Sequence, residues 1–247
     1  MTDIRHPELL IVIPARLESS RLPKKLLLDL HGKPLLYWTV KRVMRAKLAD
    51  VVVATDSARI LSMCKVFGFP VKMTSQGCLN GTERVFEVAS DMKSDYRLFM
   101  NVQGDEPLLN IEILGAMLET IGLNDHSFKT AVSEISESTT NNVAEVKVAM
   151  SRGQRIRYAS RSPIPFGRDA TLKLYKIHGV YLYPYSILEE FMNSLEGPLE
   201  KVEKVEQLRC IENDIPLYGV ITPSTPNSVD TKVDYEMYVN LDSEVFI

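Results

Sequence analysis

The chain has 247 residues, of which 45% are hydrophobic and 25% are charged, with a formal net charge of −3 at pH 7. Such a composition predicts a globular protein with a sizeable core, and the small net charge excludes a general electrostatic affinity for nucleic acid or anionic membranes. No apolar stretch is long enough to span a bilayer and the first residues lack a signal-peptide pattern, so we expect a cytoplasmic protein. The three widely spaced cysteines, Cys64, Cys78 and Cys210, are expected to be reduced thiols.

The first half of the chain alternates between strand and helix patterns. Short apolar runs predict strands at 9–13, 51–55, 71–74 and 96–102. Between them apolar residues recur at helical spacing, as at Leu36, Val40 and Val43 after Pro34, and again at 113–121 after the fourth strand. This alternation predicts the α/β class, with a mostly parallel twisted sheet and helices on both faces.

After about residue 125 the pattern changes. Strand patterns then follow one another without a long helix between them, at 131–135, 145–150, 155–158 and 176–183. This succession predicts antiparallel pairs appended to the parallel core. A helix is predicted over 199–211, a strand over 217–221, and a closing helix from about Thr231. We therefore predict one domain over residues 1–247 with an embedded β-rich subregion at about 127–184.

A cationic loop follows the first predicted strand. The apolar run ends at Pro14, and the next dozen residues carry Arg16, Arg21, Lys24 and Lys25. Open α/β sheets bind ligands at the carboxyl ends of their strands, and guanidinium and ammonium groups there suit a polyphosphate. The alternative is a solvated loop that is merely basic.

Carboxylates follow two later strands. Asp105 and Glu106 come directly after the fourth predicted strand, where Gly104 permits a turn, and Asp230 precedes the closing helix. Hard oxygen ligands beside a polyphosphate are what Mg²⁺ requires. The alternatives are a plain surface turn for the first pair, a helix N-cap for Asp230, and a helix-dipole partner for Asp234. Two separated carboxylates with a cationic loop favour metal-assisted phosphoryl transfer.

Ten short motifs occur in order between about residues 9 and 234. They are Pro14-Ala-Arg16, Ser20-Arg21-Leu-Pro23 with Lys25, Gly32-Lys33-Pro34, Ala54-Thr-Asp56, Asn80-Gly-Thr-Glu-Arg84, Asn101 to Pro107, Tyr158 with Ser160-Arg161 and Ile164-Pro165, Gly179-Val-Tyr181, Leu199-Glu200 with Glu203 and Glu206-Gln-Leu-Arg209, and Val229-Asp230-Thr231. Together they resemble the 3-deoxy-D-manno-octulosonate (Kdo) cytidylyltransferases, also called CMP-Kdo synthetases.

The resemblance implies a nucleotide-diphospho-sugar transferase-like fold and a homodimer, with the β-rich subregion as the dimer contact. It implies that CTP and Kdo react, with Mg²⁺, to give CMP-Kdo and pyrophosphate, and that neither nucleic acid nor a membrane is a partner. The implied catalytic residues are Arg16, Arg21, Lys25, Asp105 and Asp230, with the two aspartates as magnesium ligands. The implied nucleotide-binding residues are Ala15, Arg16, Lys25, Thr74, Asn80, Gly81, Thr82, Arg84 and Gln103, and those for the sugar acid are Gln103, Arg161, Tyr181, Glu206 and Gln207.

The chain departs from the family pattern at several positions. Lys24 stands where the family loop usually has glycine, and Leu26 where it has proline. If the glycine position needs a positive φ, Lys24 is strained, or else the loop has another shape. Ile177 stands where the family has histidine, and His178 follows it, so on a strand the imidazole would face the opposite side. This shift leaves open whether His178 is structural or catalytic.

Three alternatives to Kdo activation remain on the sequence alone. One is a cytidylyltransferase of the same fold for another acid, such as an 8-amino Kdo analogue, a nonulosonate or a phosphonate. Another is a sugar-1-phosphate nucleotidyltransferase, although the usual GxGxR-type start is replaced by Pro14-Ala-Arg16. The last is an inactive nucleotide-binding module, which the joint presence of Lys25, Asp105 and Asp230 disfavours.

Overall fold

The computed structural model describes residues 5–19, 21–135, 141–166, 168 and 173–246. The chain divides into two compact units. The first unit consists of Met1–Ile111 and Thr225–Ile247, and the second of Glu112–Ser224. The prediction of a single domain over the whole chain stays a prediction.

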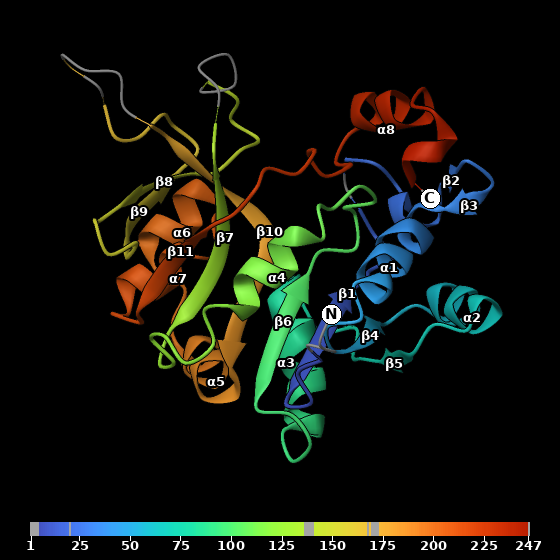
Figure 1. Ribbon diagram of the computed structural model, residues 1–247, viewed down its shortest axis with the longest axis horizontal. Coiled ribbons are helices and arrows are strands. Elements are labelled where there is room, and N and C mark those ends of the chain that lie inside the picture. The colour runs from blue at the N-terminus through green and yellow to red at the C-terminus, as the bar shows by residue number, and fades with distance from the viewer. Residues whose placement is uncertain (1–4, 20, 136–140, 167, 169–172, 247) are drawn as a thin grey trace. The chain divides into compact units, whose positions relative to one another are not determined.

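The first unit is built on a parallel sheet (Figure 1). Its strands are β1 (Leu9–Pro14), β4 (Asp50–Thr55), β5 (Val71–Met73) and β6 (Leu98–Val102), in the order β6-β1-β4-β5. All six residues of β1 are buried, because this central strand is covered on both faces. The sequence prediction of a parallel sheet with a basic loop at the end of its first strand is confirmed for this unit.

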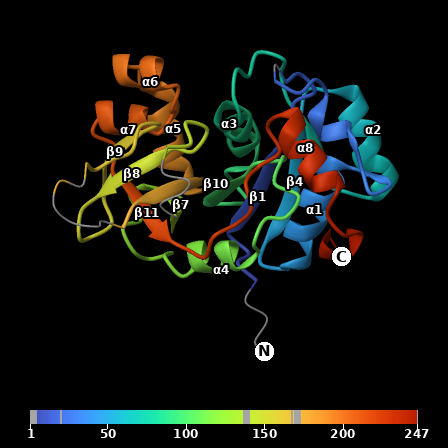
Figure 2. The ribbon, with the colours of Figure 1, turned by 90° about the horizontal axis from the view of Figure 1, so that it is seen from above.

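Helices cover both faces of this sheet (Figure 2). They are α1 (Leu35–Arg45), α2 (Ala58–Phe67) and α3 (Gly81–Met92). The unit also contains α8 (Lys232–Val239), where Tyr235 and Tyr238 bond Asp29 and His31. The start of α2 is set by Ser57, whose hydroxyl accepts the N–H of Ile60, and its end by Gly68 at a φ of 70°. Short elements complete the unit: η1 (Lys25–Leu27), the hairpin β2 (Asp29–Leu30) and β3 (Lys33–Pro34), and η3 (Ser243–Phe246).

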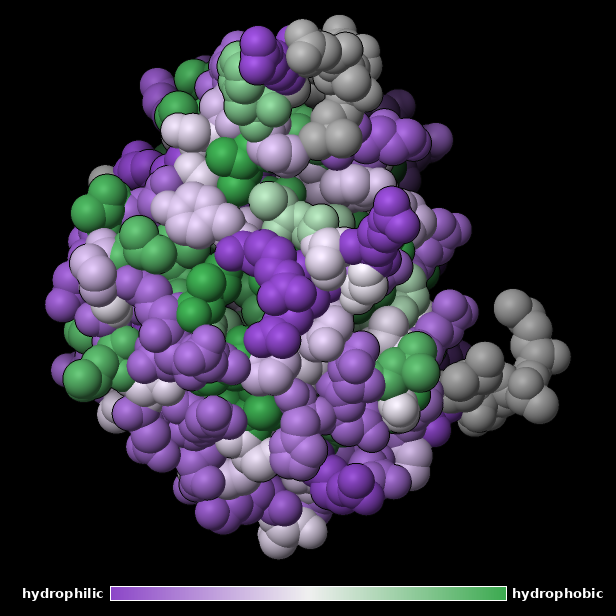
Figure 3. All heavy atoms as spheres, turned by 90° about the vertical axis from the view of Figure 1, so that its left-hand side faces the viewer, coloured by the Kyte–Doolittle hydropathy of each residue, from purple (hydrophilic) through white to green (hydrophobic). Residues whose placement is uncertain are grey.

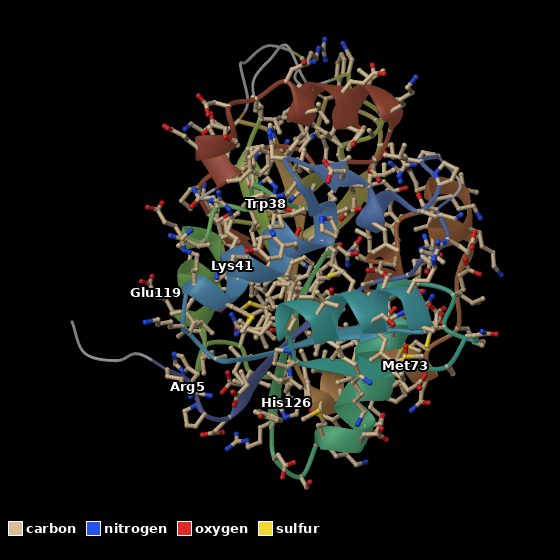
Figure 4. All side chains as sticks on the ribbon, turned by 90° about the vertical axis from the view of Figure 1, so that its right-hand side faces the viewer. Arg5, Trp38, Lys41, Met73, Glu119 and His126 are labelled. Atoms are coloured by element: carbon tan, nitrogen blue, oxygen red, sulfur yellow. The ribbon has the colours of Figure 1, made fainter. Side chains whose placement is uncertain are left out.

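Trp38 attaches α1 to its surroundings (Figure 4). Its indole N–H donates to the carbonyl oxygen of Leu30 at 2.7 Å, and its ring lies 5.3 Å from that of Phe246. Since Leu30 belongs to the hairpin and Phe246 to η3, one side chain joins three elements around the cationic loop.

The second unit contains mixed strand pairs. The strands are β7 (Phe128–Glu134), β8 (Lys147–Met150), β9 (Ile156–Ser160), β10 (Tyr175–Pro184) and β11 (Leu217–Ile221). Antiparallel pairs join β10 to β7 and β8, and β8 to β9, whereas β11 runs parallel to β7. The expected antiparallel pairs are therefore confirmed. The register of β10 against β7 shifts between Ile177 and Tyr181, so face assignments by simple alternation do not carry through this strand.

The helices of the second unit are α4 (Glu112–Leu118), α5 (Tyr185–Asn193), α6 (Pro198–Glu203) and α7 (Leu208–Glu212). The prediction of one helix over 199–211 is wrong, because the chain leaves the helical conformation at Lys204, whose φ is 55°. Such a left-handed residue ends a helix, so the apolar positions are divided between two short helices.

Within the described residues, no helix has the length and apolarity needed to cross a membrane. Figure 3 shows one face of the molecule, on which hydrophilic residues predominate and hydrophobic residues form separate small groups. Such a surface is usual for a globular protein. Cys64 and Cys210 are buried, Cys78 is half-buried, and all three are free thiols, as expected.

Candidate active site

An open cavity of about 190 Å³ lies in the first unit at the carboxyl end of β1. Its lining comes from the cationic loop, the start of α3, the turn after β6, and the segment before α8, and it comprises Pro14, Ala15, Arg16, Glu18, Ser19, Arg21, Lys25, Leu26, Asn80, Gly81, Arg84, Gln103, Gly104, Asp105 and Asp230. The fold thus brings together all five predicted catalytic residues. Of the predicted nucleotide residues, Thr74 and Thr82 are buried outside this lining.

Glycine at two positions lets backbone segments approach one another around the cavity. A Cβ on Gly104 would lie 3.1 Å from the carbonyl oxygen of Pro14, and one on Gly81 would lie 3.2 Å from Pro14 Cγ and 3.2 Å from the side-chain Nε2 of Gln103. Contacts this short require the neighbours to move. The turn after β6 and the start of α3 therefore pack closely on the end of β1 because both carry glycine.

Lys25 bridges the two candidate metal ligands. Its ammonium contacts Asp105 Oδ2 and lies 2.9 Å from Asp230 Oδ1, while Arg21 Nη2 lies 2.8 Å from the same Asp230 oxygen. Burial alone would lower the pKa of Lys25, but the charges and hydrogen bonds of the two aspartates outweigh it and raise that pKa. Burial likewise works against ionisation of Asp230, yet the nearby Lys25 and Arg21 lower its pKa. Lys25 and Asp230 therefore stay charged at neutral pH.

The carboxylates fit a divalent cation. Asp105 and Asp230 each present one oxygen to the same ammonium, so the pair already shares a single positive charge. Among the residues that the structure describes, no cluster of three or more His, Cys, Asp and Glu side chains could hold a metal. Two carboxylates match Mg²⁺ bound through one or two protein ligands and completed by phosphate oxygens and water.

Asp230 is free for this contact because its neighbour caps α8. The Thr231 hydroxyl accepts the N–H of Asp234 at 3.3 Å, and the Asp234 carboxylate accepts the N–H of Thr231 at 2.7 Å, which forms a capping box. The alternative of Asp230 as the N-cap is therefore wrong, whereas Asp234 does lie in the first turn.

The conformation of Lys24 answers the question that the sequence left open. Its φ is 57° and its ψ is 28°, in the left-handed region. The position thus has the conformation that a glycine adopts without strain, and here a lysine adopts it. Ser20, which belongs to the same motif, lies outside the described residues.

Arg84 fixes the start of α3 to two other segments. Its side chain is 2% exposed, and its guanidinium donates to the Thr74 hydroxyl and, at 3.0 Å, to Asp56 Oδ2. At the rim of the cavity, Arg16 Nη1 donates to the carbonyl oxygen of Leu79 at 3.2 Å. Arg84 and Thr74 thus form an internal support for the start of α3, where the predicted nucleotide-binding residues Asn80 and Gly81 lie.

The other predicted sugar-acid residues lie in the second unit. The Arg161 guanidinium donates to backbone carbonyls, among them Val143 at 2.8 Å and Glu203 at 2.9 Å. Gln207 is 4% exposed, and its amide donates to Glu206 Oε1 at 3.3 Å. Tyr181 is buried on β10, and its ring lies 5.7 Å from that of Phe128. Arg161 thus ties three segments of the second unit together.

His178 is buried in the second unit. Its Nε2 lies 2.8 Å from the Ser133 hydroxyl, and burial, helped by the charge of Lys176, lowers the pKa of His178 to about 4. A neutral imidazole held in this way favours the structural role for His178.

Several carboxylates that organise these segments were missed by the sequence analysis. Glu83 and Glu87 accept hydrogen bonds from the segment before α3, and Glu203 accepts those of Ser160 and of the Arg161 backbone. The spacing of Asn80 and Glu83 is that of a capping box and could have identified one of them. No signal in the sequence pairs Glu203 with residues more than forty positions away.

Comparison with known proteins identifies the family. The family model described as cytidylyltransferase matches residues 10–217. The 3-deoxy-manno-octulosonate cytidylyltransferase of Syntrophobacter fumaroxidans is 38% identical over 235 residues, which cover 92% of this chain and 94% of the relative. The chain belongs to this cytidylyltransferase family. It is therefore a nucleotidyltransferase, as the motifs predicted.

Solved structures agree with this assignment. CMP:2-keto-3-deoxy-manno-octonic acid synthetase complexed with CTP superimposes with a TM-score of 0.87 at 33% identity, covering 94% of this chain and 97% of the other. The 4-diphosphocytidyl-2C-methyl-D-erythritol synthase of Anaerococcus prevotii, at 11% identity and a TM-score of 0.62 over 94% and 96% of the two chains, shares the fold alone. The predicted nucleotidyltransferase fold is confirmed.

Proposed function

We propose that this cytidylyltransferase couples CTP to the keto-sugar acid Kdo, giving CMP-Kdo and pyrophosphate. The observation that carries the proposal is the single cavity in which Arg16, Arg21 and Lys25 face Asp105 and Asp230. The relatives with the matching name, and the similar structure complexed with CTP, support the choice of nucleotide and acceptor.

In the proposed reaction, an oxygen of the acceptor's anomeric hydroxyl forms a bond to the α-phosphorus of CTP. The bond from that phosphorus to the oxygen bridging the α- and β-phosphates breaks, pyrophosphate departs with the bonding electrons, and the hydroxyl proton passes to solvent. Charge grows on the departing phosphates, so cations aimed at them lower the barrier. Arg16, Arg21, Lys25 and Arg84 are the cations that line this cavity, and Arg84 is paired with Asp56.

We propose that Asp105 and Asp230 hold Mg²⁺ during turnover. When bound, the ion would neutralise phosphate charge and orient the reactants. In this proposal Lys25 and Arg21 bind the negatively charged phosphate oxygens. In the free protein the same two side chains pair with Asp230. The side chains must therefore exchange partners when nucleotide arrives.

For the acceptor we propose a role for Gln103 at the cavity. We also propose acceptor roles for four residues of the second unit, namely Arg161, Tyr181, Glu206 and Gln207. Support for the last four comes from their match to the family motifs, and the Arg161 contacts to backbone carbonyls suggest that it shapes the acceptor region indirectly. We further propose a homodimer with its contact in the subregion at about 127–184, and a cytoplasmic reaction, since CTP is made there.

The test is a pyrophosphate-release assay with CTP, UTP, ATP and GTP against Kdo, 8-amino Kdo, a nonulosonate and a phosphonate, with the product identified by mass. We expect CTP with Kdo to be the best pair and UTP the next nucleotide, because a pocket of buried polar groups rejects bases that leave them unpaired. Preference for another acid would replace Kdo as acceptor and keep the cytidylyl transfer. Equal use of purine triphosphates would contradict the proposal.

A further inference from the structure

Two carboxylates of α3 hold the segment that precedes this helix. Glu87 accepts the Ser75 N–H at 2.8 Å, the Ser75 hydroxyl at 2.8 Å and the Cys78 thiol at 3.2 Å. One turn earlier, Glu83 accepts the N–H of Leu79 at 2.6 Å. Residues 75–79, which we name the α3 loop, are thus attached to the helix at both ends.

The α3 loop leads directly into the cavity. The carbonyl oxygen of Leu79 accepts a hydrogen bond from Arg16, and the next two residues, Asn80 and Gly81, line the cavity. Glu87 itself is not part of the lining. The position of the loop therefore determines where the lining residues lie, and Glu87 controls that position from outside the cavity.

The charge of Glu87 suits this task. Partial burial would raise its pKa, but the hydrogen bonds from Ser75 and Cys78 and the charge of Arg84 outweigh it and lower the pKa of Glu87. The carboxylate is thus ionised at neutral pH and accepts three hydrogen bonds at once, as only a charged acceptor does well. Burial, together with the hydrogen bond and charge of Glu87, raises the pKa of the Cys78 thiol.

We propose that Glu87 is a positioning residue for the nucleotide: through Ser75 and Cys78 it holds the α3 loop in the shape that binds CTP, without touching the reacting atoms. The proposal rests on the proposed function and adds a residue to the nucleotide side of the same site. Of the proposed catalytic residues, Arg16 bonds the α3 loop through Leu79, whereas the side-chain bonds of Lys25 go to Asp105 and Asp230. Loss of Glu87 should therefore weaken nucleotide binding more than it slows the chemical step.

The kinetic test compares Glu87→Ala and Glu87→Gln with Asp91→Asn. Asp91 lies one turn further along α3 and pairs with Lys72 at 3.0 Å, so its variant removes a charge from the same helix without touching the loop. We expect Glu87→Ala, which removes all three hydrogen bonds to the loop, to raise KM for CTP at least about tenfold, the effect of losing one charge-assisted hydrogen bond, with kcat within about twofold. Glu87→Gln, which keeps an acceptor for the Ser75 N–H, should fall between, and Asp91→Asn should match the wild type.

A second readout follows the loop itself through the Cys78 thiol. Cys64 and Cys210 are buried, so a thiol reagent such as Ellman's reagent should react first with Cys78, and Cys78→Ser should remove that phase. Without nucleotide, Glu87→Ala should label about tenfold faster than wild type. The labelling rate is then measured as a function of pH. Greater access of the reagent to Cys78 raises the maximal rate at high pH, whereas a lower pKa of the thiol shifts the midpoint of the curve to lower pH.

The two readouts decide the role of Glu87 together. Wild-type labelling in Glu87→Ala, or faster labelling with an unchanged KM for CTP, would overturn the proposal. A wild-type protein that fails to use CTP would overturn the proposed function instead. In that case labelling, and nucleotide binding measured by calorimetry, would still show whether Glu87 holds the loop.

Discussion

The ammonium of Lys25 lies 2.9 Å from Asp230 Oδ1 and also contacts Asp105 Oδ2. One side-chain cation thus occupies the position between two carboxylates that a divalent metal would need. In the free protein the lysine compensates their mutual repulsion, and in the proposed complex the triphosphate would compete for the same lysine. Metal and nucleotide binding should therefore depend on each other.

The first prediction is that Lys25→Met binds Mn²⁺ without nucleotide at least about tenfold more tightly than wild type, since it leaves Asp105 without the Lys25 ammonium and Asp230 paired with Arg21 alone. Titration followed by the electron paramagnetic resonance of free Mn²⁺ measures this directly. Lys24→Met, a change of the exposed neighbouring lysine, is the matched control and should leave the affinity as it is. Equal Mn²⁺ affinity in wild type and Lys25→Met would show that the lysine does not compete with metal.

The second prediction concerns the carboxylates. Asp105→Asn and Asp230→Asn should each lower kcat by about 100-fold or more, because removing a ligand charge costs several kcal/mol of transition-state stabilisation. Circular dichroism should show an unchanged fold, and the exposed Asp91→Asn should retain its rate. A near-wild-type rate at saturating magnesium in either variant would withdraw that residue from the metal site.

The third prediction uses the left-handed conformation of Lys24. Lys24→Gly removes a Cβ that costs about 1–2 kcal/mol in this region, partly offset by about 0.5–1 kcal/mol of extra unfolded-state entropy. Lys24→Val should destabilise the protein by at least about 1 kcal/mol, because a β-branched side chain tolerates a positive φ poorly. Urea unfolding should therefore rank the variants Gly, then Lys, then Val. If Lys24→Val were as stable as Lys24→Gly, the cationic loop would have to adopt another conformation in the valine variant.

Much of the fold could be predicted because the spacing of apolar residues along the sequence shows which positions are buried. The apolar runs at β1, β4 and β6 mark strands covered on both faces, and no other element explains so short and continuous a pattern. The division between α6 and α7 could not be seen, because Lys204 is an ordinary residue in a sequence and its φ of 55° is set by tertiary packing.

The candidate site also contains residues that could be predicted from the sequence and residues that could not. Asp105 could be proposed from its position just after β6, where topology brings residues together, and Lys25 and Asp230 from the motifs to which they belong. The contacts of Glu87 and the orientation of Arg161 depend on side chains that meet across loops. Because loop conformation has no periodic signature in sequence, such supporting contacts become visible only in the structure.

The last prediction is a pH dependence of stability that originates at His178. Burial, helped by the charge of Lys176, lowers the pKa of this imidazole from its ordinary 6.5 to about 4. Between these two values the unfolded chain binds a proton that the folded chain refuses, so stability is fully present above pH 6.5 and falls as the pH drops toward 4. From pH 7 to pH 5 the group should cost roughly 2 kcal/mol of the free energy of unfolding.

Urea unfolding at the two pH values, in wild type and His178→Gln, measures this contribution. Glutamine does not titrate and can still bond the Ser133 hydroxyl, so the variant should lose about 2 kcal/mol less than wild type over this interval. His126→Gln is the matched control, since His126 belongs to the same unit but is exposed (Figure 4), and it should keep the wild-type dependence. If His178→Gln and wild type lose the same amount, the imidazole is protonated in the folded protein, and a catalytic role for His178 would have to be considered again.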